Sequence, residues 1–224
     1  MYASEELVSI IVLNFNGMHH NYLPMCIESL YAQSYNNLEI IVVDNASEDN
    51  SVAYLQSHYP NLKLIQLETN SGFCRGNNKG YSVSTGGFVL FANNDTVFAP
   101  DCIAHLVEAV NIAAKIGMAS AKLIRPSPEQ GHNDGNRLID SAGLMLKKNF
   151  TLRDRGYAQP DRGQYDDYAY LFAPCGAAAF YRRSALEAVS QNGKIWDEAF
   201  YAYYEDGDLG WRLQNQGWQC IYVP

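Results

Sequence analysis

Three acids stand within four positions in the stretch "YYEDGDLGWRLQNQGW", immediately before a predicted helix. Asp208 and Arg212 are four residues apart, which pairs opposite charges along a helix, and the helix dipole favours acids in a first turn. These two effects explain Asp208 structurally. Glu205 and Asp206 follow several tyrosines, and an apolar environment that raises the pKa of a carboxylate suits a general base. Spacing alone favours the structural interpretation and leaves the catalytic one open.

Asp95 ends the apolar run "GFVLFANNDT" and follows Asn93 and Asn94. Carboxylate and amide oxygens at the tip of a buried strand suit Mg²⁺ or Mn²⁺, which also take ligands from substrate phosphates. The alternative is a helix cap or a turn residue, because a helix is predicted to begin near Asp101. The spacing leaves both interpretations open.

Asp44 ends another apolar run, "LEIIVVD", where a carboxylate can accept a hydrogen bond from a ribose hydroxyl or a base N–H. The stretch "NSGFCRGNNKG", residues 70–80, contains glycines that let a backbone approach a ligand, and Arg75 suits a diphosphate. Ordinary turn chemistry is the alternative for each loop. Neither GxxxxGK[ST] nor GxGxxG is present, so a phosphate-binding P-loop is excluded and a dinucleotide site is only weakly supported.

These residues follow apolar runs that alternate with helical patterns, which predicts an α/β fold with a parallel sheet covered on both faces. The expected strands are Val8–Leu13, Leu38–Val43, Leu62–Leu67, Gly87–Ala92 and Met118–Ile124; the expected helices are Leu23–Gln33, Asn50–His58, Gly76–Ser84 and Asp101–Lys115. In such sheets the ligand lies outside the carboxyl ends of the strands. The polar segments there are 14–17, 44–47, 68–72 and 93–96.

The periodicity weakens between Arg125 and Tyr168, where Gly, Pro and Asp are frequent, and this predicts an irregular insert with a hairpin and long loops. A strand, a small-residue turn and a helix follow, with Ser184 as the expected N-cap and Glu187 at the capping-box position. No repeat and no linker divide the chain. We therefore predict a single domain.

Composition narrows the function classes. A net charge of −8 argues against non-specific binding of nucleic acid, and 47% hydrophobic residues support a packed core. No apolar run reaches the roughly 20 residues that span a bilayer, and the first residues lack a signal-peptide pattern. Five scattered cysteines without CxxC spacing predict a reduced, cytoplasmic protein, and Cys175 has no evident histidine partner for nucleophilic catalysis.

Six segments follow one another in the chain: "VSIIVLNFNG", "IIVVDNASEDNS", "NSGFCRGNNKG", "FANNDT", "CGAAAFYRRSALEAV" and "WDEAFYAYYEDGDLGWRLQNQGW". Together and in this order they resemble the family 2 inverting glycosyltransferases of the GT-A fold, with the bacterial rhamnosyltransferase-like branch most similar. The resemblance runs from Val8 nearly to the end. It implies a Rossmann-like α/β/α sandwich with a mostly parallel sheet and a small irregular or antiparallel C-terminal part. Residues 1–224 would form one catalytic domain, with a nucleotide-binding half (1–125) and an acceptor half (126–224).

The resemblance also implies the chemistry: a sugar moves from a nucleotide diphosphate sugar, UDP- or dTDP-linked, to a hydroxyl of a glycan or lipid-linked acceptor, with inversion. Asp206 matches the family's general base, with Glu205 as the alternative. Asp95 and Asn93 stand where a DxD motif holds Mn²⁺ or Mg²⁺, although Asn replaces the first Asp. The implied donor-binding residues are Asn14, Asn16, Asp44, Asn45, Asn70, Gly72, Arg75, Asn78, Asn94, Cys175 and Gly176.

The chain ends at "QGWQCIYVP", where the family continues to a metal-binding histidine, so we expect a C-terminally truncated catalytic domain. The expected setting is polysaccharide or cell-envelope glycan synthesis in the cytoplasm, with peripheral contact at the inner face of the membrane. Two alternatives stay open: a non-catalytic nucleotide-sugar binding module, and a nucleotidyltransferase on a similar sheet. The latter would need a Gly-rich basic loop near the N-terminus, which this sequence lacks.

Overall fold

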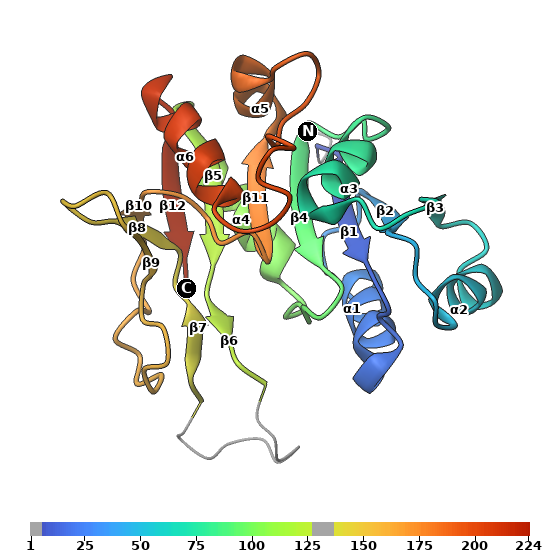
Figure 1. Cartoon of the computed structure of the whole chain (residues 1–224). Coiled ribbons are helices and arrows are strands. Elements are labelled where there is room, and N and C mark those ends of the chain that lie inside the picture. The colour runs from blue at the N-terminus through green and yellow to red at the C-terminus, as the bar shows by residue number, and fades with distance from the viewer. Residues whose placement is uncertain (1–5, 127–136) are drawn as a thin grey trace, which may run out of the picture.

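The computed structural model describes residues 6–126 and 137–224 and is built around one eight-stranded sheet (Figure 1). Its strands are β1 Val8–Asn14, β2 Leu38–Asp44, β3 Lys63–Gln66, β4 Phe88–Asn93, β5 Ile116–Ala121, β10 Ala169–Leu171, β11 Ala178–Arg182 and β12 Gln219–Val223. The order across the sheet is β10-β12-β5-β11-β4-β1-β2-β3. Only β10 and β11 run antiparallel to their neighbours in this sheet. The predicted mostly parallel α/β fold is confirmed.

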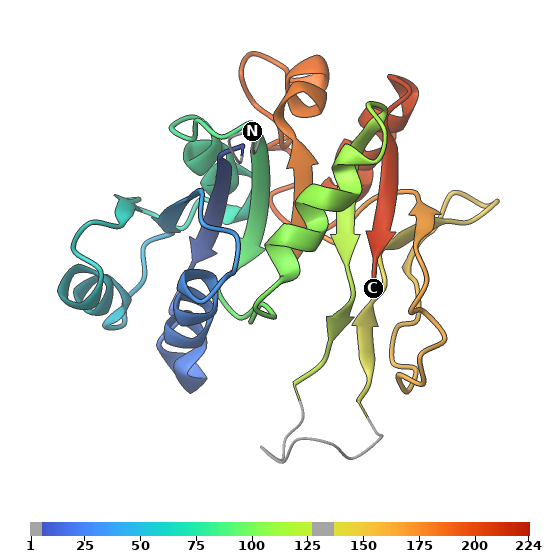
Figure 2. The ribbon, with the colours of Figure 1, turned by 180° about the vertical axis from the view of Figure 1, so that it is seen from behind.

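Helices cover both faces of the sheet. The helices are α1 Tyr22–Tyr31, α2 Ser51–His58, α3 Gly72–Tyr81, α4 Cys102–Asn111, α5 Arg183–Val189 and α6 Glu205–Asn215, with a short 3-10 turn, η1 His19–Asn21, before α1. Side chains of a strand alternate between faces, so Ile10 packs in the core beneath α1 and α4 while Ile11 packs in the core beneath α3, α5 and α6. Viewed from behind, α1 and α4 lie in front of the sheet (Figure 2). None of the helices in the described part of the chain is long and apolar enough to cross a membrane.

Two small antiparallel pairs involve the predicted irregular insert, one of them with a strand just before it. β6 Leu123–Ile124 pairs with β7 Ile139–Ser141, and β8 Leu144–Leu146 pairs with β9 Leu152–Asp154. The expected hairpin is therefore present. Most of the expected loop before it, residues 127–136, lies outside the described residues.

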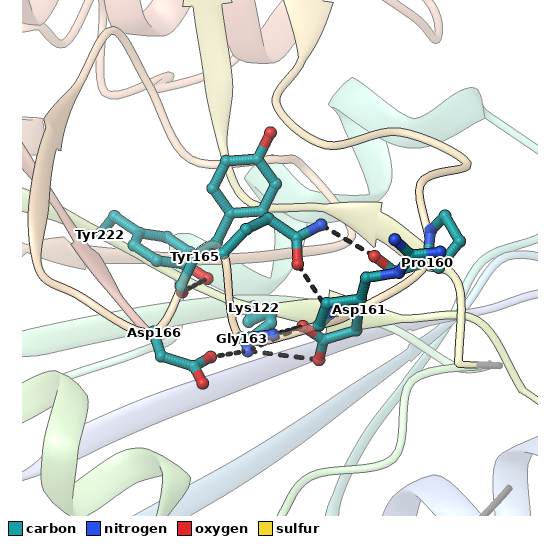
Figure 3. A network of polar contacts seen from close by, with 9 residues as sticks. Lys122, Pro160, Asp161, Gly163, Tyr165, Asp166 and Tyr222 are labelled. Carbon is teal, nitrogen blue, oxygen red and sulfur yellow. Dashed lines mark hydrogen bonds and ion pairs between the residues drawn. The ribbon is translucent and has the colours of Figure 1, made fainter. Parts of the chain in front are cut away.

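A polar network fixes the second half of the insert to the sheet (Figure 3). Lys122, just after β5, binds Asp166 and Asp161, the latter with its nearest oxygen 3.3 Å from Nζ. Burial alone lowers the pKa of Lys122, but the hydrogen bonds to the two carboxylates outweigh it and raise the pKa. Tyr222 of β12 donates a hydrogen bond of 2.8 Å to the carbonyl of Tyr165. The insert is thereby held at the carboxyl ends of β5 and β12.

Two predicted helix starts are wrong. The helix expected from Gly76 begins at Gly72, because the carbonyl of Tyr201 accepts hydrogen bonds from the exposed first-turn N–H groups of Phe73 and Cys74, at 2.8 and 3.3 Å. No local sequence pattern contains that contact.

Ser184 is not the N-cap of α5. The helix begins at Arg183, the cap position belongs to Arg182, and no side chain makes a cap bond there. The guanidinium of Arg182 instead donates to the carbonyl of Val110, at 2.8 Å, near the end of α4. Strand β11 therefore runs directly into the helix, two residues before the predicted cap.

Candidate active site

A buried hydrogen-bond network joins the carboxyl ends of β1, β2 and β4. Asn14 is fully buried, and its amide donates to Asp44 at 2.8 Å and to Ser47 at 3.1 Å while its oxygen accepts from Asn94 at 2.7 Å. The Asp44 carboxylate also accepts from the backbone N–H and the hydroxyl of Ser47, at 2.9 and 2.7 Å. Asn16 completes this side through its N–H, 2.9 Å from the Ser47 hydroxyl. Three of the predicted loops are therefore joined by hydrogen bonds at one edge of the sheet.

The turn after β4 connects this edge to the turn before β11. The N–H of Asn93 and the hydroxyl of Thr96 both donate to the carbonyl of Ala177, at 3.0 and 3.2 Å. Asp95 is exposed, and within the described residues its carboxylate accepts no hydrogen bond. It therefore acts neither as a cap of α4 nor as a turn-forming acceptor, which were the structural alternatives for this residue.

Gly176, next to Ala177 in the turn before β11, lies close to two acids at the start of α6. The N–H of Gly176 donates to Asp206 at 3.1 Å, and a side chain at position 176 would lie 3.5 Å from an oxygen of Asp206 and 3.6 Å from one of Glu205. Both carboxylates therefore face the small-residue turn before β11. Asp208 points elsewhere and forms the predicted helix pair with Arg212, with an N–O distance of 2.8 Å.

Both facing acids have raised pKa values. Burial raises the pKa of Glu205 to about 7, the nearby Asp206 charge adds to the rise, and its Oε2 is buried without a partner among the described residues. Burial also raises the pKa of Asp206, although the N–H groups of Gly176 and Gly207 stabilise its charged form; Asp154 raises it further. Carboxylates with raised pKa values at one edge of a sheet are suited to accept protons near neutral pH.

Strained backbone precedes these acids. Tyr201, Tyr203 and Tyr204 all have left-handed φ angles, between +59° and +71°, which bulky side chains rarely adopt. All three side chains are exposed, Tyr203 by 82%. Tyr201 also contacts Gly72, where an added Cβ would come within 2.6 Å of its ring. The segment 201–204 therefore ties the start of α3 to the start of α6.

Not all predicted donor residues meet at this edge. Asn45 links the neighbouring loops through Asn70 and the N–H of Ser71, with its amide oxygen 2.8 Å from that N–H. The Asn78 amide binds the segment 195–198, including the carbonyl of Trp196 at 2.8 Å. Arg75 is exposed and pairs with Glu198 at 3.3 Å. These contacts position loops of this chain.

A groove of about 710 Å³ borders α3, the loop after β3 and residues 192–198. It is lined by Arg75 and Asn78, but not by Asp44, Asp95 or Asp206. The groove therefore does not contain these three acids. Cys175, beside Gly176, is half-buried, and burial raises the pKa of its thiol to about 12, which leaves it a poor nucleophile.

The end of β4 and the turn after it fit a divalent cation that also takes ligands from a phosphate group. Among residues 6–126 and 137–224, no three His, Cys, Asp or Glu side chains gather as a metal cluster. Asp95 and Asn93 nevertheless offer an exposed carboxylate and a half-buried amide whose side chains have no hydrogen-bond partner in that part of the chain. Mg²⁺ and similar ions bind in this way, through one or two protein oxygens plus substrate phosphates.

The sequence prediction missed three participants. Ser47 bonds both Asn14 and Asp44, Tyr201 caps α3, and Asp154 of β9 contributes negative charge beside Asp206. Ser47 had a signal, since it lies in the loop after β2. Tyr201 and Asp154 had none for these roles, because each acts on a residue far from it in the chain.

The fold is that of the GT-A glycosyltransferases. A mannosyltransferase from Pyrobaculum calidifontis, solved in complex with GDP-Man and Mn²⁺, superposes with a TM-score of 0.65 at 18% identity, over 98% of this chain and 55% of that one. Residues 9–190 match the sequence model of the family described as "Glycosyl transferase family 2". The chain therefore belongs to glycosyl transferase family 2.

Two curated relatives show the range of the family. An uncharacterized glycosyltransferase of Nostoc sp. is 31% identical over 205 residues, which is 88% of this chain and 58% of that protein. An N-acetylglucosaminyl-diphospho-decaprenol L-rhamnosyltransferase of Mycobacterium tuberculosis is 25% identical over 236 residues, which is 98% of this chain and 74% of that protein. The chain thus spans little more than half the length of the Nostoc relative.

Proposed function

We propose that this chain is an inverting glycosyltransferase that moves a sugar from a nucleotide diphosphate sugar to an acceptor hydroxyl. The observation that carries the proposal is the Asp206 carboxylate, with its raised pKa, bonded to Gly176 on the same sheet edge as Asp44 and Asp95. Family membership supports the reaction class. Residues 1–125 would hold the nucleotide and residues 126–224 the acceptor, within one catalytic domain.

Asp206 acts as the base. As the acceptor oxygen attacks the anomeric carbon, the carboxylate takes the hydroxyl proton, so the nucleophile does not have to attack while fully protonated. The bond from that carbon to the diphosphate oxygen breaks on the opposite face, and the diphosphate leaves with the electron pair. Attack opposite the leaving group inverts the configuration. Glu205, buried and with a pKa near 7, is the alternative base.

The donor binds along the edge made by Asn14, Asn16, Asp44 and Asn94. Asp44 orients the ribose or the base, and the buried Asn14 holds Asp44 and Asn94 in place. Asp95 and Asn93 would hold Mn²⁺ or Mg²⁺, which supplies positive charge to stabilise the departing diphosphate. Asn45, Asn70, Gly72 and Asn78 serve by fixing the loops around this edge.

Polysaccharide or cell-envelope glycan synthesis is the proposed setting, with a glycan or lipid-linked acceptor. The Mycobacterium tuberculosis relative, whose name describes a lipid-diphosphate acceptor and a rhamnosyl donor, supports this class of acceptor and a rhamnosyl-type transfer. The proposed donors are UDP- or dTDP-linked sugars. Binding of a GDP-linked sugar instead would change the proposed nucleobase of the donor from uracil or thymine to guanine.

The test compares Asp206→Asn with Glu205→Gln. Donor binding is measured by titration of UDP-, dTDP- and GDP-sugars with Mn²⁺, and turnover is measured as nucleotide released in the presence of candidate acceptors. We expect Asp206→Asn to bind the donor as wild type does while turnover falls roughly 10²- to 10⁴-fold, the usual share of a general base. Glu205→Gln should retain most of the turnover.

A reversed ranking of the two variants would assign the base to Glu205. If the wild-type chain binds donor but releases no nucleotide with any acceptor, it is a binding module instead. Release of pyrophosphate would identify a nucleotidyltransferase.

A further inference from the structure

The turn between β8 and β9 projects from the molecule in both overall views (Figures 1 and 2). We name residues 147–150, Lys147 to Phe150, the hairpin tip. Its shape is fixed by a bond of 2.9 Å from the N–H of Phe150 to the carbonyl of Lys147 and by the hydroxyl of Thr151, 2.8 Å from the Asn149 oxygen. Phe150 has a left-handed φ of +62° and is 73% exposed. An ordered turn thus presents an aromatic ring to solvent.

The ring of Phe150 lies next to apolar side chains on α6 and nearby segments, and together they form a larger apolar surface. Its centroid lies 6.1 Å from that of Trp211, which lies 6.3 Å from that of Phe172. Trp211 is 43% exposed, and Met145 on the neighbouring strand is 41% exposed. Exposed aromatic residues that gather on two adjacent elements indicate an interaction surface rather than scattered exposure.

The hairpin that carries Phe150 is rich in positive charge, in a chain whose net charge is −8. Lys147, Lys148 and Arg153 are exposed, and none of the ion pairs formed within residues 6–126 and 137–224 uses them. The acid on the hairpin, Asp154, is half-buried, and its charge raises the pKa of Asp206. The local charge therefore opposes the charge of the whole chain and complements an anionic partner.

We propose that the hairpin tip and Trp211 dock on the surface of an anionic phospholipid membrane. Aromatic side chains prefer the level of the lipid headgroups, and lysines next to them are attracted to anionic lipids. A rigid turn that carries both at one projecting point needs no transmembrane helix for this contact. Nucleic acid fits less well, because the rest of the surface is acidic.

The hairpin also connects this surface to the acids of the site. Leu152 packs on Gly207, where an added Cβ would come within 2.0 Å of it, and β9 ends at Asp154 beside Asp206. Asp154 lies four positions after Phe150 in the chain, at most about 13 Å away at the usual rise per residue of a strand. The distance from a membrane at the hairpin tip to Asp206 would thus be about the length of a short acceptor.

The test is co-sedimentation of the whole chain with vesicles of phosphatidylcholine, alone or mixed with phosphatidylglycerol, at low and high salt. We expect binding to the anionic vesicles that weakens with salt, and little binding to phosphatidylcholine alone. The variant Lys148→Glu with Phe150→Ser should bind at least about tenfold more weakly, because each charge near the surface contributes about fivefold.

The matched control is Lys115→Glu with Ile112→Ser. It also reverses one exposed lysine and removes an exposed apolar side chain, 62% exposed, but after α4 and away from the hairpin. Equal loss in both variants, or no binding by the wild-type chain, overturns the proposal. A wild-type dimer that only the hairpin variant dissociates would assign the surface to a second copy. None of these outcomes needs a sugar donor, so failure here leaves the proposed transfer untouched.

Discussion

At the scale of single residues, the adjacent acids Glu205 and Asp206 differ in burial because they are successive residues of a helix. Successive residues of a helix are rotated by about 100°, so Glu205 and Asp206 are buried to different extents although both carboxylates reach the turn at Gly176. Glu205 turns toward the core and is only 7% exposed, whereas Asp206 is less buried and holds the N–H of Gly176. The orientation favours Asp206 as the residue that meets an acceptor. Glu205 then remains largely protonated below its pKa of about 7.

This difference predicts how stability depends on pH. The folded chain keeps the Glu205 proton up to about pH 7, while the unfolded chain releases it near 4.5. Unfolding therefore releases a proton between these values, and the free energy of unfolding falls as the pH rises, by at most about 1.4 kcal/mol per pH unit. Glu205→Gln should remove this loss and be more stable than wild type at pH 8, by on the order of 2 kcal/mol. Urea unfolding at pH 5, 6, 7 and 8 measures it.

Glu187→Gln, in α5, is the control for the loss of one acidic side chain outside the site. Its stability should follow the wild-type dependence on pH. Parallel curves for wild type and Glu205→Gln would mean that Glu205 is ionised in the folded protein. Its orphaned oxygen would then need a partner beyond the described residues.

At the scale of elements, α3 depends on a residue more than a hundred positions away. Gly72 has a φ of +79° and lies against the Tyr201 ring, whose backbone carbonyl caps the helix. Gly72→Ala adds left-handed strain and a clash with that ring. We expect it to lower the free energy of unfolding by roughly 2–3 kcal/mol, as measured by chemical denaturation.

Gly193→Ala separates the two effects. Gly193 has nearly the same φ, +77°, but nothing lies within 4 Å of an added Cβ. It should cost only the backbone strain, about 1 kcal/mol. If both variants cost the same, the Tyr201 ring moves aside freely and the contact does not fix the start of α3.

Helix α3 also illustrates which features could be predicted from the sequence and which could not. The strands and most helices follow from periodicity, and their polar carboxyl ends follow from the sheet rule, which brought Asn14, Asp44 and Asn94 to one edge. Asn78 is expected at the donor by resemblance alone, and its hydrogen bond to the carbonyl of Trp196 had no signal in the sequence. Contacts between segments far apart in the chain leave no periodic pattern. They could be found only once the fold was known.

At the scale of the whole molecule, the hydrogen-bonded edge joins both halves of the sheet. Asp44, Asn14 and Asn94 lie on one side, and Ala177, Gly176 and Asp206 continue it on the other. The two sides meet at the turn after β4, where Asp95 is exposed. A ligand that binds there contacts elements from both halves. Its binding should therefore stabilise the entire fold and not one loop.

This argument predicts a metal-dependent rise in Tm. A nucleotide sugar at a hundred times its dissociation constant adds about 2.7 kcal/mol, which in a chain of this size raises Tm by roughly 5–10 °C. With Mn²⁺ present we expect this rise for wild type; Asp95→Asn should lose most of it, because a neutral amide holds the cation more weakly than a carboxylate. Asp101→Asn, an exposed acid without a side-chain cap bond at the start of α4, should respond as wild type does. An equal rise in Tm for wild type, Asp95→Asn and Asp101→Asn would mean that neither the cation nor the diphosphate binds at Asp95. A rise that does not depend on Mn²⁺ would mean that protein groups alone bind the diphosphate, and Arg75, an exposed cation in residues 70–80, would be tested next.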